Sequence, residues 1–164
     1  MRKSIVAVGI KAITRNFLRW VLFTFWLWAT PTTVEAVCTI SSTSVAFGTY
    51  DPFNAAPLNT AGQIVYMCGN RDHNVSISLS RGSAPSFQPR LMQNGNSSLQ
   101  YNLYLDPAQT IIWGDGSGGT QTYFIKNPQA NNQELSIPIF GSIPPGQNVT
   151  VGNYSDTLTL TIDF

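Results

Sequence analysis

Apolar and polar residues alternate along much of this chain, and this two-residue period limits its possible folds more than any other feature. Successive side chains of a β-strand point to opposite faces, so the alternation predicts strands with one buried face and one solvated face. The expected core-facing positions are Ile64, Tyr66, Cys68, Val75, Ile77, Leu79, Leu99, Tyr101, Leu103, Leu105, Leu135, Ile137, Ile139, Leu158, Leu160, Ile162 and Phe164. No comparable helical period occurs. We therefore predict an all-β sandwich.

Segments rich in Gly, Pro and Asn separate the alternating runs, and this composition predicts loops. They span Asp51 to Gly62, Arg81 to Pro89, Gly114 to Gly119 and Asn127 to Asn132. The sequence contains no internal repeat, and its length suits one domain.

The first 36 residues are predicted to be a secretory signal peptide. A basic leader precedes an apolar run from Trp20 to Ala29, and Val34-Glu35-Ala36 offers small residues to a signal peptidase. An uncleaved membrane anchor is the alternative, but this run is about half of the ~20 residues that cross a bilayer. We expect cleavage after Ala36, which leaves a mature domain of residues 37–164 that is exported to the periplasm and then to the cell surface or beyond.

The chain has two cysteines, Cys38 and Cys68. An even pair in an exported domain favours a disulfide over a metal or redox site, with two buried free thiols as the alternative. Closing this loop would stabilise the fold by about 3 to 4 kcal/mol in the chain-entropy model.

Removal of the leader changes the net charge. Five of the nine Lys and Arg residues lie in the leader, so four basic and seven acidic residues remain and the net charge falls to about −3. Nucleic-acid binding is driven by release of counterions from phosphates, which needs clustered basic residues. We therefore expect no nucleic acid among the partners.

The mature domain offers little for catalysis. Its one histidine, His73, lies just before a predicted strand, where a solvated turn residue is a simpler interpretation than a general base. One histidine and a cysteine pair are too few ligands for a transition-metal site. The stretch Trp113 to Gly119 lacks the Lys-Ser/Thr pair of a P-loop and the spaced acids of an EF-hand, so we interpret it as a hairpin loop. We expect no enzyme activity, no metal and no cofactor.

Six short motifs follow one another in an order that resembles the spore coat protein U domain. They are Cys38 with Phe47-Gly48-Thr49-Tyr50-Asp51 and Cys68, Arg90-Leu91-Met92, Leu99 to Tyr104, Trp113 to Gly116, Phe140 to Pro144, and Gly152 to Thr157. Each motif is weak alone, but their order over nearly the whole mature chain is specific. Phe140 departs from the family pattern, in which a tyrosine is common at this position, but the replacement is conservative.

The resemblance implies a place among pilin subunits of archaic, Csu-type chaperone-usher pili and related coat proteins. Such subunits are immunoglobulin-like sandwiches that lack their final strand. A periplasmic chaperone, and later the N-terminal extension of a neighbouring pilin subunit, fills the resulting groove by β-strand addition, and an outer-membrane usher is a further partner. The expected edge of the groove consists of Leu158, Leu160, Ile162 and Phe164.

Cleavage after Ala36 would leave only Val37 ahead of the first cysteine. The subunit could then accept a strand but not donate one, which would place it at the distal tip of a fibre. Cleavage near Ala29 is the alternative, and it would leave Thr30 to Val37, a poor donor because it contains Pro31.

A tip subunit would meet a surface or host ligand through loops at the end of the sandwich farthest from the fibre. The candidate loops are Asp51 to Asn59, Ala84 to Pro89 and Gly114 to Gly119, and their apolar residues Phe53, Leu58 and Phe87 either contact a surface or fold back on the core. The expected function is that of a structural and adhesive pilus subunit in surface attachment or biofilm formation. The alternative is a self-contained, secreted spore-coat or matrix protein.

Overall fold

The computed structural model describes residues 38–42, 44–68, 74–126 and 133–163. These residues form strands joined by turns and contain no helix, so none of them builds a helix that could span a membrane. The strands are β1 (Cys38–Ser42), β2 (Leu58–Cys68), β3 (Asn74–Leu79), β4 (Arg90–Asn94), β5 (Ser97–Tyr104), β6 (Tyr123–Lys126), β7 (Glu134–Ile143) and β8 (Leu160–Asp163). The predicted all-β fold is confirmed. The predicted leader and His73 lie outside the described residues.

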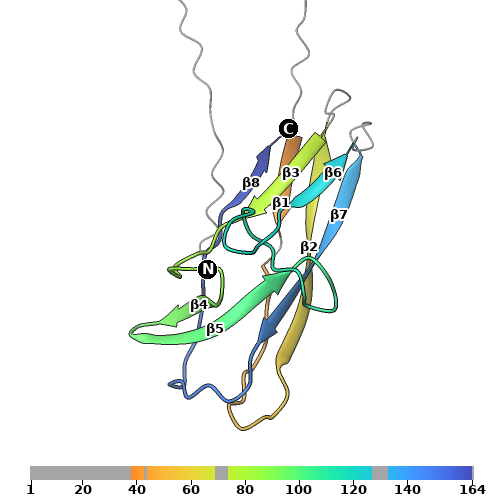
Figure 1. Cartoon of the computed structure of the whole chain (residues 1–164). Coiled ribbons are helices and arrows are strands. Elements are labelled where there is room, and N and C mark those ends of the chain that lie inside the picture. Colours follow the sequence, from red (N-terminus) through yellow and green to blue (C-terminus); the bar gives the residue numbers. More distant parts are fainter. Residues whose placement is uncertain (1–37, 43, 69–73, 127–132, 164) are drawn as a thin grey trace, which may run out of the picture. The chain divides into compact units, whose positions relative to one another are not determined.

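The strands form two antiparallel sheets. The larger sheet has the order β1-β2-β7-β5-β4, and the smaller sheet has the order β6-β3-β8 (Figure 1). The longest pairing joins β2 to β7, from Leu58 opposite Ile143 to Met67 opposite Glu134. β1 and β4 are therefore the edges of the larger sheet, and β6 and β8 are the edges of the smaller one.

Side chains that point inward from both sheets share one core. Ile64 of β2, Ile77 of β3 and Ile137 of β7 are at most 2% exposed. The alternating residues beside them are also buried as predicted, except Leu135, which is half-buried. Gly141 of β7 allows the N-terminal segment to pack closely on the sheet, because a Cβ at this position would lie 2.6 Å from the Phe47 ring. That ring in turn meets Tyr101 edge-on, with the ring centroids 5.9 Å apart.

The arrangement is that of an immunoglobulin-like sandwich. β3 and β8 take the places of strands C and F, and Tyr154 forms the tyrosine corner expected just before strand F, where its hydroxyl donates to the carbonyl of Thr150 at 2.8 Å. The disulfide differs from that of antibody domains. It joins Cys38 of β1 to Cys68 of β2 within one sheet, with an S–S distance of 2.10 Å, which confirms the predicted pairing.

Several strand boundaries differ from the predicted ones. β2 begins at Leu58, inside the segment predicted as a loop, because Leu58 already pairs with Ile143 of β7. β8 begins at Leu160 rather than near Thr157, because the Thr159 amide donates to the Ser80 hydroxyl and not to a backbone carbonyl.

Arg90 is fully buried, which its charge did not suggest. Its guanidinium donates to the Ser80 carbonyl at 3.0 and 3.1 Å, to Asn102 Oδ1 at 2.7 Å and to the Trp113 carbonyl at 2.5 Å. It also lies 5.1 Å from the centre of the Phe87 ring. Burial lowers the pKa of Arg90, but an arginine stays protonated across the physiological range. The side chain therefore links β4 and β5 of the larger sheet to the end of β3 in the smaller one.

We expect Arg90→Met to lower the free energy of unfolding by about 3 kcal/mol or more, because it leaves the carbonyls of Ser80 and Trp113 without their donor. Urea unfolding of the disulfide-bonded protein measures this difference. Arg81→Met is the matched control, since Arg81 is exposed and donates to the Pro85 carbonyl, and it should cost less than about 1 kcal/mol. Equal losses in the two variants would contradict the assigned role of Arg90.

Candidate strand-acceptor site

Two strand edges border the seam between the sheets. β8 is the last strand of the smaller sheet and pairs with β3, while β1 is the outermost strand of the larger sheet and pairs with β2. Figure 1 shows β8 and β1 next to each other. In a complete immunoglobulin-like domain, strand G lies beside strand F. Among the described residues, no strand occupies that place beside β8.

Half-buried apolar side chains run along this seam. Ile162 is half-buried although its partner across the ladder, Ile77, is 0% exposed, and Leu160 is half-buried opposite Leu79 at 3%. On the other lip, Ile40 is half-buried opposite Tyr66, which is 4% exposed. Ile77 and Tyr66 have a strand on both sides, and Leu79 has β8 on one side and the backbone of Gly114 on the other, whereas each outer residue has a strand on one side. The partial exposure is therefore what a missing strand would leave behind.

The predicted groove residues are distributed as follows. Leu158, Leu160 and Ile162 all pack against the core and are half-buried at the seam, with Leu158 just ahead of β8. Phe164 lies outside the described residues. The sequence did not indicate the opposite lip, which β1 forms and which the disulfide fastens to β2.

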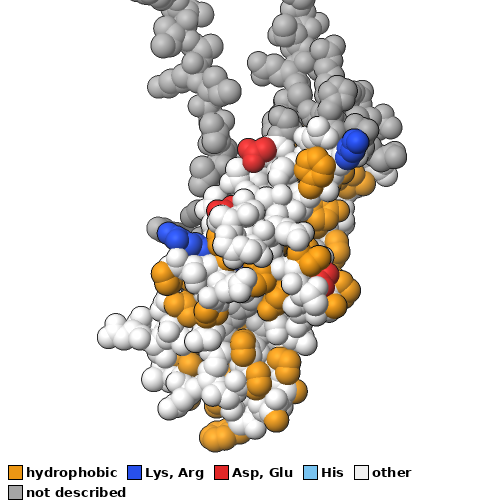
Figure 2. Space-filling view, in the orientation of Figure 1, with side chains coloured by type: hydrophobic (Ala, Val, Ile, Leu, Met, Phe, Trp, Pro, Cys, Tyr) orange, Lys and Arg blue, Asp and Glu red, His pale blue; other side chains and the backbone are white. Residues whose placement is uncertain are grey.

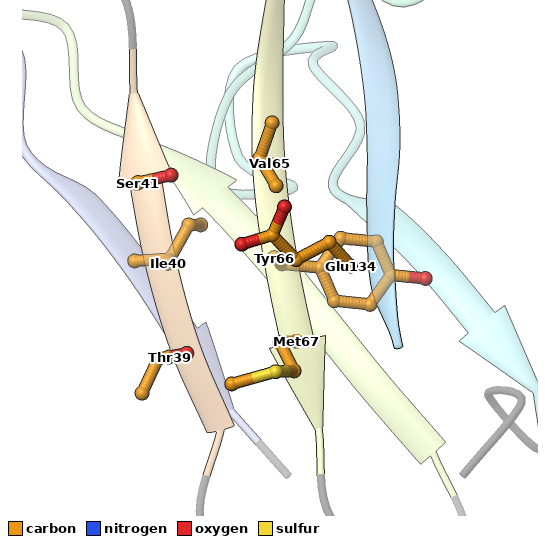
Figure 3. Close-up of a pocket in the computed structure, with 7 residues that line it drawn as sticks. All are labelled: Thr39, Ile40, Ser41, Val65, Tyr66, Met67 and Glu134. Atoms are coloured by element: carbon orange, nitrogen blue, oxygen red, sulfur yellow. The ribbon is translucent and has the colours of Figure 1, made fainter. Parts of the chain in front are cut away.

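A shallow hollow of about 150 Å³ lies on β1 and β2 near the disulfide (Figure 3). Thr39 and Ser41 of β1, Val65 and Met67 of β2, and Glu134 of β7 line it, together with Ile40 and Tyr66. Glu134 is its one charged lining residue. Ligand pockets usually combine an apolar wall with several convergent polar groups, so we assign no small-molecule site to this hollow.

The proposed surface-contact residues are separated in the structure. Phe53 is 95% exposed in the turn before β2, at the end of the sandwich where β2 begins and β7 ends. Figure 2 shows hydrophobic side chains exposed at this end. Of the two alternatives left open by the sequence, folding back on the core holds for Phe87, which is 8% exposed and packs on Arg90, and for Leu58, which is a half-buried residue of β2.

The loops Ala84 to Pro89 and Gly114 to Gly119 do not extend this end. They lie beside each other near the end of β3, since a Cβ on Gly118 would contact Phe87 and Leu79 donates to the Gly114 carbonyl. Asp115 closes the second loop by accepting from the amide and hydroxyl of Ser117, and these hydrogen bonds lower its pKa. The described residues contain no cluster of three or more His, Cys, Asp or Glu side chains that could hold a metal.

A polar network that the sequence did not reveal holds the segment ahead of β8. Asp156 Oδ2 accepts from the Tyr101 hydroxyl at 2.7 Å, and Oδ1 accepts from the Ser83 amide at 3.1 Å. Burial, and then the hydrogen bond to Asp156, raise the pKa of Tyr101 far above its usual value. The motif Gly152 to Thr157 marked the segment, but no local pattern showed that its carboxylate reaches the other sheet.

Three comparisons with known proteins agree with this architecture. Residues 24–161 match the Spore Coat Protein U domain. The chain is 33% identical to Protein U of Myxococcus xanthus over 148 residues, which are 80% of this chain and 79% of that protein. The fold resembles a chain in the crystal structure of a CsuC-CsuE chaperone-tip adhesion subunit pre-assembly complex from archaic chaperone-usher Csu pili of Acinetobacter baumannii, with a TM-score of 0.59 and 21% identity.

That structural match covers 80% of this chain and 40% of the solved chain, so the present chain spans less than half of that neighbour. Because the identity is only 21%, this match shows a shared fold and no more. The domain match, in contrast, extends over most of the sequence and includes all the motifs from Cys38 to Thr157. The chain therefore belongs to the Spore Coat Protein U domain family.

Proposed function

We propose that this protein is a chaperone-usher pilus subunit that is completed by a strand from a partner, added between β8 and β1. The observation that carries the proposal is the pair of neighbouring strand edges with half-buried Leu160, Ile162 and Ile40 between them. An added strand would find backbone hydrogen-bond groups on β8 and an apolar seam for its alternate side chains. An open apolar edge is otherwise an aggregation hazard, so a chaperone partner fits the same feature.

The seam on the opposite side of the sandwich is less suited to strand addition. β7 pairs with β5 only from Phe140 to Ser142, so the part of β7 from Glu134 to Ile139 is also an edge among the described strands. The Cα atoms of Cys38 and Cys68 are 4.2 Å apart, which marks a non-hydrogen-bonded pair. Backbone groups alternate in direction along β2, so Gln63, which lies opposite Pro138, directs its own groups towards β1. The nitrogen of Pro138 therefore points away from β2, towards the open edge of β7. Proline has no N–H to donate there, and the neighbouring charge of Glu134 adds to the protection.

The partners and the route follow from this role. A periplasmic chaperone would fill the seam first, an outer-membrane usher would receive the subunit, and a neighbouring pilin subunit would supply the final strand. Export requires a signal, and residues 1–36 are the proposed signal peptide. They lie outside the described residues, as does the predicted cleavage site. The neighbour's description as a chaperone-tip adhesion subunit complex supports this route.

A position at the fibre tip is the finer part of the proposal. With cleavage after Ala36 the subunit would have no donor segment of its own. The turn that carries Phe53 would then be the part that contacts a surface, because it combines an exposed aromatic ring with exposed Ala55, Ala56 and Pro57. Contact of this kind would support attachment and biofilm formation.

A secreted coat or matrix protein is the second candidate. The match of residues 24–161 to the Spore Coat Protein U domain favours it, because the name of that family refers to a coat protein. Such a protein would fold without a partner strand. Stable, monomeric protein obtained in the absence of any chaperone would support this candidate over the pilus subunit.

We expect Ile162→Asp to reduce co-purification with the periplasmic chaperone at least tenfold, because a buried carboxylate in the seam costs well over about 1.4 kcal/mol. Thr161→Asp is the matched control. Thr161 is the next residue of β8 and is exposed, so its substitution should leave capture close to the wild-type level. Formation of the Cys38–Cys68 disulfide in both variants would show that each was exported. Equal capture of the two variants would contradict the proposed groove.

We expect the exported protein to begin at Val37 and to lose two hydrogen atoms relative to its reduced form. Intact mass spectrometry under reducing and non-reducing conditions measures both features. A start ten or more residues upstream would contradict the tip position, because the chain would then carry a longer segment ahead of Cys38 that could serve as a donor.

A further inference from the structure

We propose that Asp156 is a positioning residue for strand capture. Its carboxylate fixes the segment Ser155 to Thr159, which continues the edge of β8, in the extended form that an incoming strand needs. The inference rests on the proposed function. It gives a role in strand capture to a residue that is not itself part of the groove.

The carboxylate connects three parts of the molecule. Its Oδ2 accepts from the hydroxyl of Tyr101 in β5 at 2.7 Å, and its Oδ1 accepts from the amide of Ser83, in the loop after β3, at 3.1 Å. Oδ1 also accepts from the amide of Thr157 at 2.9 Å. Asp156 therefore holds its own segment to both sheets of the sandwich.

This segment needs such a tie because its strand pairing is interrupted. Ser155 forms an isolated bridge with Gln93 of β4, with N–O distances of 2.8 and 3.2 Å. Thr159 bonds to Ser80, with its carbonyl accepting from the Ser80 amide and its amide donating to the Ser80 hydroxyl, both at 2.9 Å. The residues between these two anchors include Leu158, which is half-buried and packs against the core. Asp156 supplies the hold inside this interval.

Two further features are suited to this role. Tyr101 is 4% exposed, and its raised pKa keeps the hydroxyl protonated as a donor well into the alkaline range. Residue 82 is a glycine with φ of +66°, and a Cβ there would overlap the Asp156 carboxylate. The loop after β3 can approach Asp156 closely only because it has no side chain at this point.

The affinity for an added strand is highest when the accepting edge is already extended, because ordering each loose residue on binding costs backbone entropy. Loss of a hydrogen bond to a charged group is worth roughly tenfold in an equilibrium constant. The effect should be confined to strands long enough to reach the segment, since β8 itself is held by its ladder with β3.

The test uses refolded, disulfide-bonded protein and two synthetic peptides of alternating valine and threonine with lysine at the ends. One peptide is long enough to lie along Ser155 to Asp163, and the other covers β8 alone. We expect Asp156→Ala and Tyr101→Phe to raise the Kd of the long peptide about tenfold and to leave that of the short peptide unchanged. Asp156→Asn, which retains one acceptor oxygen, should recover part of the affinity.

Asp106→Ala is the matched control. Asp106 accepts similar hydrogen bonds from Thr110 and Ile111, but its turn folds back on β5. This variant should bind both peptides like the wild type. Wild-type affinity of Asp156→Ala and Tyr101→Phe for the long peptide would overturn the inference, as would equal weakening of both peptides, which indicates general destabilisation. A wild-type protein that binds neither peptide would overturn the proposed function and the inference with it.

Discussion

The buried guanidinium of Arg90 joins β4 and β5 to the end of β3 and to the backbone of Trp113, and these hydrogen bonds hold the two sheets of the sandwich together. Two sheets that share a full set of strands are held at the correct spacing by packing along both seams. Among the described residues, no strand fills the seam between β8 and β1, so apolar packing there is incomplete. The Ser80 carbonyl accepts from Arg90, while the amide and hydroxyl of the same residue bond to Thr159. The spacing of the sheets and the position of the acceptor edge are thus linked through one residue.

The seam between β8 and β1 and the open part of β7 differ in how readily a further strand could pair with them. β8 and β1 contain no proline, and the disulfide fastens β1 in place. β7 carries Pro138 and Glu134 at its open part, two devices that discourage pairing. A domain that accepts a strand at one site, as we propose for this one, has to refuse strands at the other. The chemistry of these edges therefore favours addition next to β8 over addition next to β7.

The strands that repeat a clear period were predictable from sequence, and the residues that owe their burial to distant partners were not. Ile64, Ile77 and Ile137 are buried because local alternation decides which face they occupy. The short strands β1, β4 and β6 were not predicted, because none of them lies in a longer alternating run, whereas the equally short β8 lies within the alternation of residues 157–164. On the seam, Leu160 and Ile162 followed from the C-terminal alternation.

Polar residues set the limit of prediction from sequence. Arg90 bonds groups that lie 10 to 23 residues away in the sequence, and Asp156 bonds Tyr101 and Ser83, which lie 55 and 73 residues away, so only the folded backbone brings them together. Phe87 lies among Ser, Pro and Gln, so the sequence left open whether its ring is exposed, and in the structure the ring covers the Arg90 guanidinium. The family motifs pointed to these regions without showing what each side chain does.

Hydrogen exchange of the disulfide-bonded protein, alone and with its periplasmic chaperone bound, tests the central claim most directly. If a strand is added along the seam, the amides of Leu160 and Ile162 in β8 and that of Ile40 in β1, which point away from their own ladders, should slow together on binding. The amides of Glu134 to Ile137 in β7 should exchange at the same rate in both states. Protection confined to β7 and β6, with β8 and β1 unchanged, would contradict the account.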